Sequence, residues 1–480
     1  MRYVDAAPEP SDVADFIATV RTHADFFDGG APITIARAPG RLDVMGGIAD
    51  YSGALVLELP LEAACFCAAQ STRDAGITVR SLAELREQAR EVTVSLDALA
   101  PNGALLDYDA ARMVLASEPS GRWAAYVLGA LVVLARERQV DVTHGVRMLI
   151  DSRVPLGKGV SSSAALEVAA MKALCGEYGK DIDGRALALL CQLVENRVVG
   201  APCGVMDQMT AAIGERDRLL ALRCQPAEVE GQVALPPTLE VWGIDSGIRH
   251  EVGGADYGAV RVGAAMGYRI IADVAGLDAR VVAEGRVQVD DPRWCGYLAN
   301  VTPSEWESAY REAVPEVVDG ASFLQRYGGV ADPMSRVDPS CSYAVRHPTA
   351  HPIYEHQRVD RFRGLLEAGG EDEAERLDLG DLMYQSHASY GACGLGSTGT
   401  DKLVALVRAA GPAAGLYGAK ITGGGSGGVV AVLARAGSRQ TVDRVARDYE
   451  HLTGRPSLVL GGSSDGATRF GTIRLAPLSS

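Results

Sequence analysis

The sequence has little positive charge for its size and no long apolar run. Lys and Arg number 46 against 61 Asp and Glu, which leaves a formal net charge of −15. Non-specific nucleic-acid binding needs a basic face that displaces counterions, so no nucleic-acid partner is expected. No stretch approaches the ~18 apolar residues of a membrane-spanning helix. Residues 1–16 lack the apolar run of a secretory signal, so we expect no membrane association and predict a cytoplasmic location.

The sequence also lacks any paired cysteine pattern. It has nine cysteines, an odd number, with no Cys-x-x-Cys pair, so reduced thiols are expected rather than a zinc site or a disulfide framework. The 480 residues are 47% hydrophobic, which predicts two to four domains with ample core. Strand-like and helix-like segments are mixed throughout, so the predicted class is α+β or α/β. Residues 226–237 are a plausible crossing point between two halves, and residues 286–360 are expected to contain long loops.

The 55 glycines gather at a few places, and one of these is a glycine- and serine-rich segment. Val154–Ala165 reads VPLGKGVSSSAA between a predicted strand and a predicted helix. Gly157 and Gly159 let the backbone approach a ligand, and the serines fall where a helix begins, so that backbone N–H groups face an anion. Lys158 is followed by glycine, so the segment is not a Walker A loop. Phosphate binding and an ordinary strand-to-helix turn with serine caps both remain open.

Three further segments carry candidate residues. Residues 420–430 read KITGGGSGGVV between strand-like residues, which favours a tight turn within a domain over a flexible linker. In CGVMDQ, Asp207 stands at a predicted helix start, where an acidic residue is often only an N-cap. Residues 37–51 place Arg41 and Asp50 on a glycine-punctuated turn after a strand, where a structural ion pair is an equal alternative.

Taken together, these segments resemble the signature motifs of the GHMP small-molecule kinases. The galactokinase motif G-R-x-N-x-x-G-E-H-T-D-Y corresponds to GRLDVMGGIADY at residues 40–51, and ENRVVGAPCGVMDQ at 195–208 is similar as well. With WGIDSGIRHEVGGADY at 242–257, these segments are most similar to the L-arabinokinase group of the galactokinase-like branch. The resemblance implies an α+β, two-domain GHMP kinase fold: a ribosomal S5 domain 2-like domain at 1–235 and a C-terminal GHMP domain at 236–480.

The resemblance also implies an activity and a role for each motif residue. It implies an ATP-dependent sugar 1-kinase in which Asp207 lies beside the reacting anomeric hydroxyl and Arg41 pairs with Asp207. Whether Asp207 removes the proton or only orients the hydroxyl stays open. Sugar contacts are implied for Asp50, Gly204 (through its backbone) and Tyr257. The nucleotide and its Mg²⁺ are assigned to the remaining motif residues: ATP to Gly157, Gly159, Ser161, Ser162, Ser163, Ala164 and Gly424, and Mg²⁺ to Glu195 with Ser162 or Ser163.

One departure from the galactokinase motif bears on the substrate. The Glu and His of that motif are Gly47 and Ile48 here, and the resemblance implies that these positions face the sugar C6. L-Arabinopyranose has the ring stereochemistry of D-galactopyranose without the C6 hydroxymethyl group, so Ile48 can fill that space. A buried hydroxyl without a partner costs about 1–3 kcal/mol, so we predict a strong preference for L-arabinose.

Other interpretations remain open at this stage. Gly47→Glu with Ile48→His is expected to raise galactose use, whereas no change would mean that Gly47 serves only the turn. A galactokinase, a hexuronate 1-kinase and a non-catalytic sugar sensor are the alternative functions. The sequence does not indicate an oligomeric state.

Overall fold

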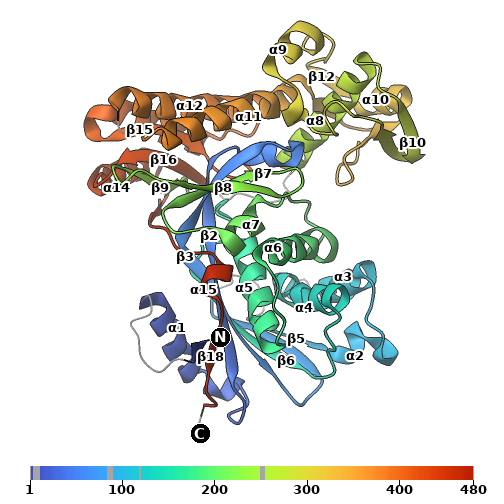
Figure 1. Ribbon diagram of the computed structural model, residues 1–480, viewed down its shortest axis with the longest axis vertical. Coiled ribbons are helices and arrows are strands. Elements are labelled where there is room, and N and C mark those ends of the chain that lie inside the picture. The colour runs from blue at the N-terminus through green and yellow to red at the C-terminus, as the bar shows by residue number, and fades with distance from the viewer. Residues whose placement is uncertain are drawn as a thin grey trace.

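The computed structural model describes residues 2–3, 11–83, 90–117, 121–248, 255–370 and 372–478, and it mixes helices and strands as predicted. Two long antiparallel strands, β2 (Ile33–Met45) and β3 (Leu55–Ser71), run through the middle of the molecule (Figure 1). The sequence predicts two separate strands here, at residues 55–59 and 63–69. They form the single strand β3 because β7 pairs with its first residues and β6 with its last.

Seven further strands complete this large sheet around β2 and β3. The order is β1-β18-β2-β3-β6-β4-β5, and β7 and β8 continue from the other end of β3. The added strands are β1 (Arg2–Tyr3), β4 (Gly76–Ser81), β5 (Glu91–Ser95), β6 (Val146–Ser152), β7 (Arg218–Arg223), β8 (Glu228–Ala234) and β18 (Ile473–Leu475).

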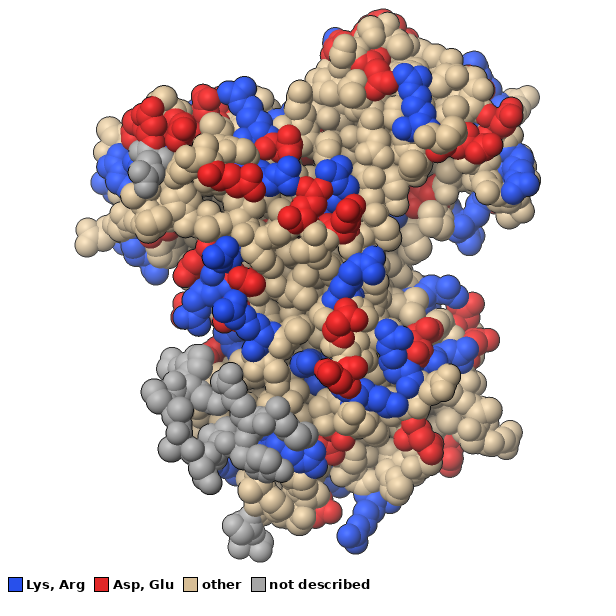
Figure 2. All heavy atoms as spheres, in the orientation of Figure 1, with Lys and Arg blue, Asp and Glu red and all other residues tan. Residues whose placement is uncertain are grey.

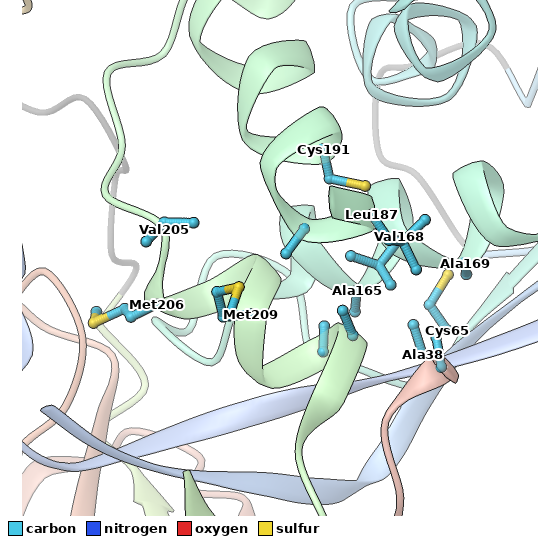
Figure 3. Close-up of a cluster of buried hydrophobic side chains, with 14 of the residues drawn as sticks. Ala38, Cys65, Ala165, Val168, Ala169, Leu187, Cys191, Val205, Met206 and Met209 are labelled. Atoms are coloured by element: carbon cyan, nitrogen blue, oxygen red, sulfur yellow. The ribbon is translucent and has the colours of Figure 1, made fainter. Parts of the chain in front are cut away.

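Most helices of this part cover one face of the large sheet and form the main core with it, while α1 packs against the other face. Small side chains of α5 let it pack closely on β2 and β3, and Figure 3 draws Ala165, Val168 and Ala169 of α5 in one cluster with side chains of neighbouring helices and strands. This packing fixes the start of α5 next to the loop that follows β6. The helices on this part are α1 (Ser11–Thr22), α2 (Leu96–Leu99), α3 (Tyr108–Ala116), α4 (Ala124–Arg138), α5 (Ser162–Glu177), α6 (Gly184–Leu193), a π-helix (Val194–Val199), α7 (Met206–Ile213) and α15 (Ala467–Phe470).

A second sheet of four strands lies beyond the other end of β2. Its order is β15-β16-β9-β17, with antiparallel pairs throughout. The glycine-rich segment joins β15 to β16 as a turn, so the prediction of a turn within a domain is confirmed. The elements of this part are β9 (Leu239–Asp245), β15 (Leu416–Ile421), β16 (Val429–Arg435), β17 (Val459–Leu460), α12 (Glu373–Ala392), α13 (Thr398–Ala410) and α14 (Arg439–Thr453).

The segment between α8 and α11 forms a lobe with its own core, seen at the upper right of Figure 1. Trp294, Trp306 and Phe323 are fully buried in that core. The expectation of long loops over residues 286–360 was therefore wrong, because scattered aromatic side chains supply a core that periodicity did not reveal. The elements are α8 (Ala255–Val274), β10 (Ala279–Ala283), β11 (Gly285–Val289), α9 (Pro303–Glu305), a π-helix (Trp306–Tyr310), β12 (Val317–Asp319), α10 (Gly320–Tyr327), β13 (Gly329–Val330), β14 (Ser342–Ala344) and α11 (Arg346–Glu367).

One more local expectation is corrected. Pro348 and Pro352 predict a loop around His347 and His351, but both histidines lie on α11. Pro348 is in the first turn of this helix, where a missing N–H removes no helical hydrogen bond, and Pro352 is accommodated further along. Residues 226–237, expected as a crossing point between halves, contain β8 of the large sheet, and the chain passes to the second sheet between the end of β8 and the start of β9 at Leu239.

The end of the described chain returns to the large sheet, since β18 pairs with β2. The division into domains at 235/236 stays a prediction. On the face shown in Figure 2, Lys and Arg are interleaved with Asp and Glu. Within the described ranges, none of the helices has the length and apolar character needed to cross a membrane.

Candidate active site

A cavity of about 780 Å³ lies where the large sheet, the start of α5 and the β15–β16 turn meet. It brings together residues from sequence segments that are far apart. Every predicted site residue lines it except Gly47 and Ala164: the lining includes Arg41, Ile48, Asp50, Gly157, Gly159, Ser161, Ser162, Ser163, Glu195, Gly204, Asp207, Tyr257 and Gly424.

Arg41 and Asp207 meet in the middle of the cavity. Asp207 is the second residue of α7, and its Oδ1 lies 2.9 Å from Arg41 Nε and 2.7 Å from Arg41 Nη2. Arg41 Nη1 donates to the carbonyl of Gly159 at 2.7 Å, which ties the pair to the loop before α5. Burial alone would lower the pKa of Arg41, but nearby Asp207 and Glu58 raise it above the usual value, so the guanidinium stays charged.

Asp50 forms one end of the cavity. It lies on the short 3₁₀ helix Gly47–Ser52, is 5% exposed, and its Oδ1 has no hydrogen-bond partner in the described part of the chain. A β-carbon on Gly204 would lie 1.7 Å from Asp50 Oδ2, so only glycine fits there. Burial and the charge of Asp207 raise the pKa of Asp50 to about 7, and Arg261 opposes the shift. A buried acceptor of this kind is suited to a ligand hydroxyl.

Aromatic side chains and a buried cation complete this end. The rings of Tyr257 and Tyr51 meet edge to face at 6.0 Å, and the buried Tyr51 hydroxyl has no hydrogen-bond partner among the residues that the structure describes. Arg261 lies over the Tyr51 ring at 5.6 Å and is held by two hydrogen bonds to Asp332, at 2.7 and 3.1 Å. The sequence analysis missed Arg261 and Asp332, since neither lies in a recognisable motif, although Arg261 follows Tyr257 by one helical turn.

The opposite end of the cavity is built from the loop between β6 and α5. Gly157 and Gly159 have φ of 66° and 72°, and Ser161 has φ of 59°, a conformation that side chains rarely adopt. α5 then begins at Ser162. The Ser161 hydroxyl is buried and has no hydrogen-bond partner among the described residues. Backbone N–H groups at the start of a helix and an unpartnered hydroxyl fit a phosphate group.

Glu195 lies beside this loop on the π-helix that follows α6, a rare conformation often found at functional sites. Gln208 Nε2 donates to Glu195 Oε2 at 2.7 Å and to Glu167 Oε2 at 3.2 Å. Burial and Asp207 raise the pKa of Glu195 to about 7, opposed by hydrogen bonds from Cys203 and Ser163. The described residues contain no cluster of three or more His, Cys, Asp or Glu that could hold a metal. One carboxylate with serine hydroxyls fits Mg²⁺ that is shared with phosphates and waters.

Gly47 and Ala164 lie just behind the cavity wall. Gly47 N–H donates to Asp43 Oδ1 at 2.9 Å, and a β-carbon on Gly47 would lie 1.6 Å from the Tyr390 hydroxyl. Gly47→Glu with Ile48→His therefore does not fit the native packing, which corrects the expectation that these two changes alone raise galactose use. Ala164 is buried in the first turn of α5.

Several cavity residues had no clear sequence signal. Beyond the phosphate-facing loop the cavity continues between α3 and α4, where Arg112, Arg122 and Tyr126 line it. Glu58 was also missed: it is fully buried and its Oε2 lies 3.2 Å from Arg41 Nε. A lone acidic residue in the apolar run LVLEL could have pointed to it. Lys158, although in the loop, does not line the cavity and instead pairs with Asp245 at 2.6 Å.

Comparisons with known proteins agree with this geometry. The family model for the GHMP kinases N terminal domain matches residues 125–215, the model for the galactokinase galactose-binding signature matches 21–71, and the model for GHMP kinases C terminal matches 374–451. Three segments of the chain are therefore similar to the GHMP kinases. The first match contains the loop before α5 and Asp207, the second contains Asp50, and the third contains Gly424.

The chain is similar to L-arabinokinase of Arabidopsis thaliana, with 43% identity over 94% of this chain and 47% of that protein. It thus spans about half the length of that relative. It is also 29% identical to galactokinase of Chloroflexus aggregans, over 88% of each chain.

Solved structures confirm the two-domain GHMP kinase fold. The structure of Lactococcus lactis galactokinase complexed with galactose matches with a TM-score of 0.72 at 19% identity, covering 94% of this chain and 99% of that one. Mevalonate kinase of Methanococcus jannaschii matches with a TM-score of 0.55 at 13% identity, covering 90% and 98%.

Proposed function

We propose that the protein transfers the γ-phosphoryl group of ATP to the anomeric hydroxyl of L-arabinose, giving L-arabinose 1-phosphate and ADP. The observation that carries this proposal is the Arg41–Asp207 pair, which lies between an anion-binding loop and a buried carboxylate in one cavity. The similarity to L-arabinokinase supports the same activity.

Asp207 and Arg41 divide the work at the reacting atoms. Asp207 accepts a hydrogen bond from the anomeric hydroxyl and takes or orients its proton as the oxygen attacks phosphorus. Arg41 holds Asp207 in position through its hydrogen bond and offers positive charge to the phosphoryl oxygens in the transition state. Because Arg41 also donates to the Gly159 carbonyl, the nucleophile and the phosphate-facing loop keep a fixed separation.

The loop before α5 binds the triphosphate through backbone N–H groups of residues 157–163, with Gly424 opposite it. Mg²⁺, held by Glu195 and the hydroxyl of Ser162 or Ser163, would neutralise phosphate charge. Gln208 holds Glu195 in place through the hydrogen bond at 2.7 Å.

Sugar selection takes place at the Asp50 end. Asp50 accepts hydrogen bonds from ring hydroxyls, Gly204 lets the ring approach, and Tyr257 covers one side of it. Ile48 is 1% exposed and presents an apolar wall where D-galactose carries its C6 hydroxymethyl group. A hydroxyl buried against that wall loses about 1–3 kcal/mol, so L-arabinose is preferred over D-galactose by roughly 5–150-fold.

The test is ATP-dependent ADP release by the purified chain with Mg²⁺ and, in turn, L-arabinose, D-galactose, D-galacturonate and D-glucuronate. Turnover confined to L-arabinose is expected. Equal kcat/KM for D-galactose and L-arabinose would refute the assignment of Ile48 as the wall that disfavours galactose. Turnover on a uronate alone would mean that a uronate, and not L-arabinose, is the substrate. No turnover on any sugar, together with retained sugar binding, would indicate a non-catalytic sensor.

A further inference from the structure

Tyr390 lies behind the sugar end of the cavity and does not line it. It belongs to α12, is fully buried, and comes from a part of the chain more than 300 residues after the sugar-facing turn. Its hydroxyl accepts a hydrogen bond from the Ile48 N–H at 2.8 Å and donates one to the Gly423 carbonyl at 2.9 Å. One phenol thus connects two turns that both line the cavity.

The Tyr390 ring is held firmly in this position. It belongs to a small apolar cluster with Ile48, Cys393 and Leu395. On another side its ring meets that of His351 edge to face at 5.2 Å. A buried side chain enclosed in this way cannot change rotamer without opening a cavity, so the position of its hydroxyl is fixed.

The same hydroxyl occupies the space in front of the Gly47 α-carbon. A β-carbon there would lie 1.6 Å from the Tyr390 Oη and 2.8 Å from its Cζ, well inside van der Waals contact. Asp43 Oδ2 closes another side at 2.6 Å, and it is itself fixed by Lys420 Nζ at 2.6 Å. Tyr390 and Asp43 therefore leave room only for glycine at position 47. The close packing around Gly47 in turn fixes the position of the Ile48 backbone.

We propose that Tyr390 is a specificity-determining positioning residue: it fixes Ile48 as the wall at the sugar end of the cavity and so excludes sugars that are larger there. This proposal rests on the proposed sugar kinase function. When the bonds to Ile48 N–H and Gly423 O are lost, the turn at 47–48 can move back from the cavity. A sugar with a hydroxymethyl group on C5 then gains room, while L-arabinose loses a well-fitting wall.

The first experiment compares Tyr390→Phe with Tyr449→Phe. Tyr449 is a matched control, because it is also fully buried and its hydroxyl donates to the Ser246 carbonyl at 2.6 Å, away from the cavity. We expect Tyr390→Phe to raise the galactose-to-arabinose ratio of kcat/KM about fivefold or more, mainly through KM. Tyr449→Phe should lower Tm and leave the ratio unchanged. An unchanged ratio in Tyr390→Phe overturns the proposal.

The second experiment needs no activity. Gly47→Ala is expected to lower Tm strongly in the native background and less in a Tyr390→Leu background, because the tyrosine atoms at 1.6 and 2.8 Å are gone and only the clash with Asp43 Oδ2 at 2.6 Å remains. Strictly additive shifts in Tm overturn the packing argument. If Tyr390→Leu does not fold alone, Tyr390→Phe serves as the background, since it removes the atom at 1.6 Å and should show a smaller recovery.

The two experiments separate this proposal from the proposed function. A native protein that does not phosphorylate L-arabinose refutes the function, while the Tm cycle still tests the contact between residues 47 and 390. A native protein that is active on L-arabinose, with a sugar ratio insensitive to Tyr390→Phe, refutes the positioning role alone.

Discussion

The two ends of the cavity use different chemical groups to contact a ligand. The phosphate-facing end uses main-chain groups of one continuous loop, with Gly157, Gly159 and Ser161 in left-handed conformations. The sugar-facing end uses buried side chains: Asp50 and Ile48 come from the 3₁₀ helix Gly47–Ser52 and Tyr257 from α8, and Tyr390 supports them from α12. Arg41 and Asp207 lie where the two ends meet.

This difference implies that the two ends have separate roles. A loop that contacts phosphate through its backbone recognises it whichever sugar is the phosphoryl acceptor, because every residue of the loop supplies an N–H group. Side chains that are buried without partners recognise one pattern of hydroxyls, because each hydroxyl that is absent or added leaves a polar group unpaired. Substitutions at the sugar end should therefore change which acceptor is used, and substitutions at the phosphate end should change how well any acceptor is used.

The largest effect is expected at the junction of the two ends. Asp207→Asn removes the proton acceptor, so we expect kcat to fall about 10³-fold, within the range for loss of a general base. Affinity for ATP should change only a few-fold because the backbone cradle is intact. Steady-state kinetics measures kcat, and calorimetry measures the affinity for ATP. Asp443→Asn, which changes an ion pair with Arg439 on the surface, is the control. A fall of less than tenfold would mean that Asp207 only orients the hydroxyl.

The next largest effect is expected at the phosphate end. Glu195→Gln should lower kcat/KM for ATP about 10–100-fold and raise the Mg²⁺ concentration needed, because a metal ligand is weakened. Glu167→Gln is the matched control: Glu167 shares the Gln208 amide at 3.2 Å and is fully buried, but does not line the cavity. Activity is titrated with Mg²⁺ at fixed ATP for both variants. Identical Mg²⁺ curves for Glu195→Gln and the native protein would contradict the assignment.

The two ends also differ in how far the sequence could predict them. The loop at 157–163 could be singled out because its glycines and serines are consecutive, although phosphate binding and an ordinary strand-to-helix turn both stayed open. The turn at 423–425 was predicted from the strand-like residues on both sides of it. Asp50 and Tyr257 were assigned only through resemblance to a family motif.

Tyr390 and Arg261 could not be predicted, since each acts through a contact between distant segments. Nothing in SHASYGACG shows that the Tyr390 hydroxyl ends 2.8 Å from the Ile48 N–H. The strands and helices with strong periodicity were predicted well. The lobe at residues 286–345 was not, because its core depends on scattered aromatics and on long-range packing.

A third prediction concerns how far the buried carboxylate of Asp50, at the sugar end, lowers the stability of the fold. Asp50→Asn should weaken L-arabinose binding about tenfold, since a neutral amide accepts a weaker hydrogen bond than a carboxylate. It should also raise Tm at pH 8. Burial and Asp207 raise the pKa of Asp50 from 3.8 to about 7, so ionised Asp50 destabilises the fold progressively from pH 4 to pH 7 and constantly above it.

Thermal unfolding of Asp50→Asn and the native protein at pH 4 and pH 8 measures this directly. The gain in Tm should be large at pH 8 and small at pH 4, where Asp50 is protonated in the folded chain and only partly ionised in the unfolded chain. A gain of the same size at both pH values would mean that the buried charge is not its cause.

The smallest effect is the pH dependence of sugar binding in the absence of nucleotide. Because the pKa of Asp50 is raised to about 7 by burial and Asp207, against the opposing charge of Arg261, the ionised acceptor is lost as the pH falls below 7. Affinity for L-arabinose should then fall by at most tenfold per pH unit between pH 7 and pH 5. Glu195, whose pKa is also raised to about 7 by burial, lies at the phosphate end, so omitting ATP and Mg²⁺ removes its contribution. Calorimetric titration of the native protein should show this decline, and Asp50→Asn should bind weakly at every pH. A native profile that is flat between pH 5 and pH 8 would remove Asp50 from sugar recognition, and with it the contrast between a charged sugar end and a backbone phosphate end.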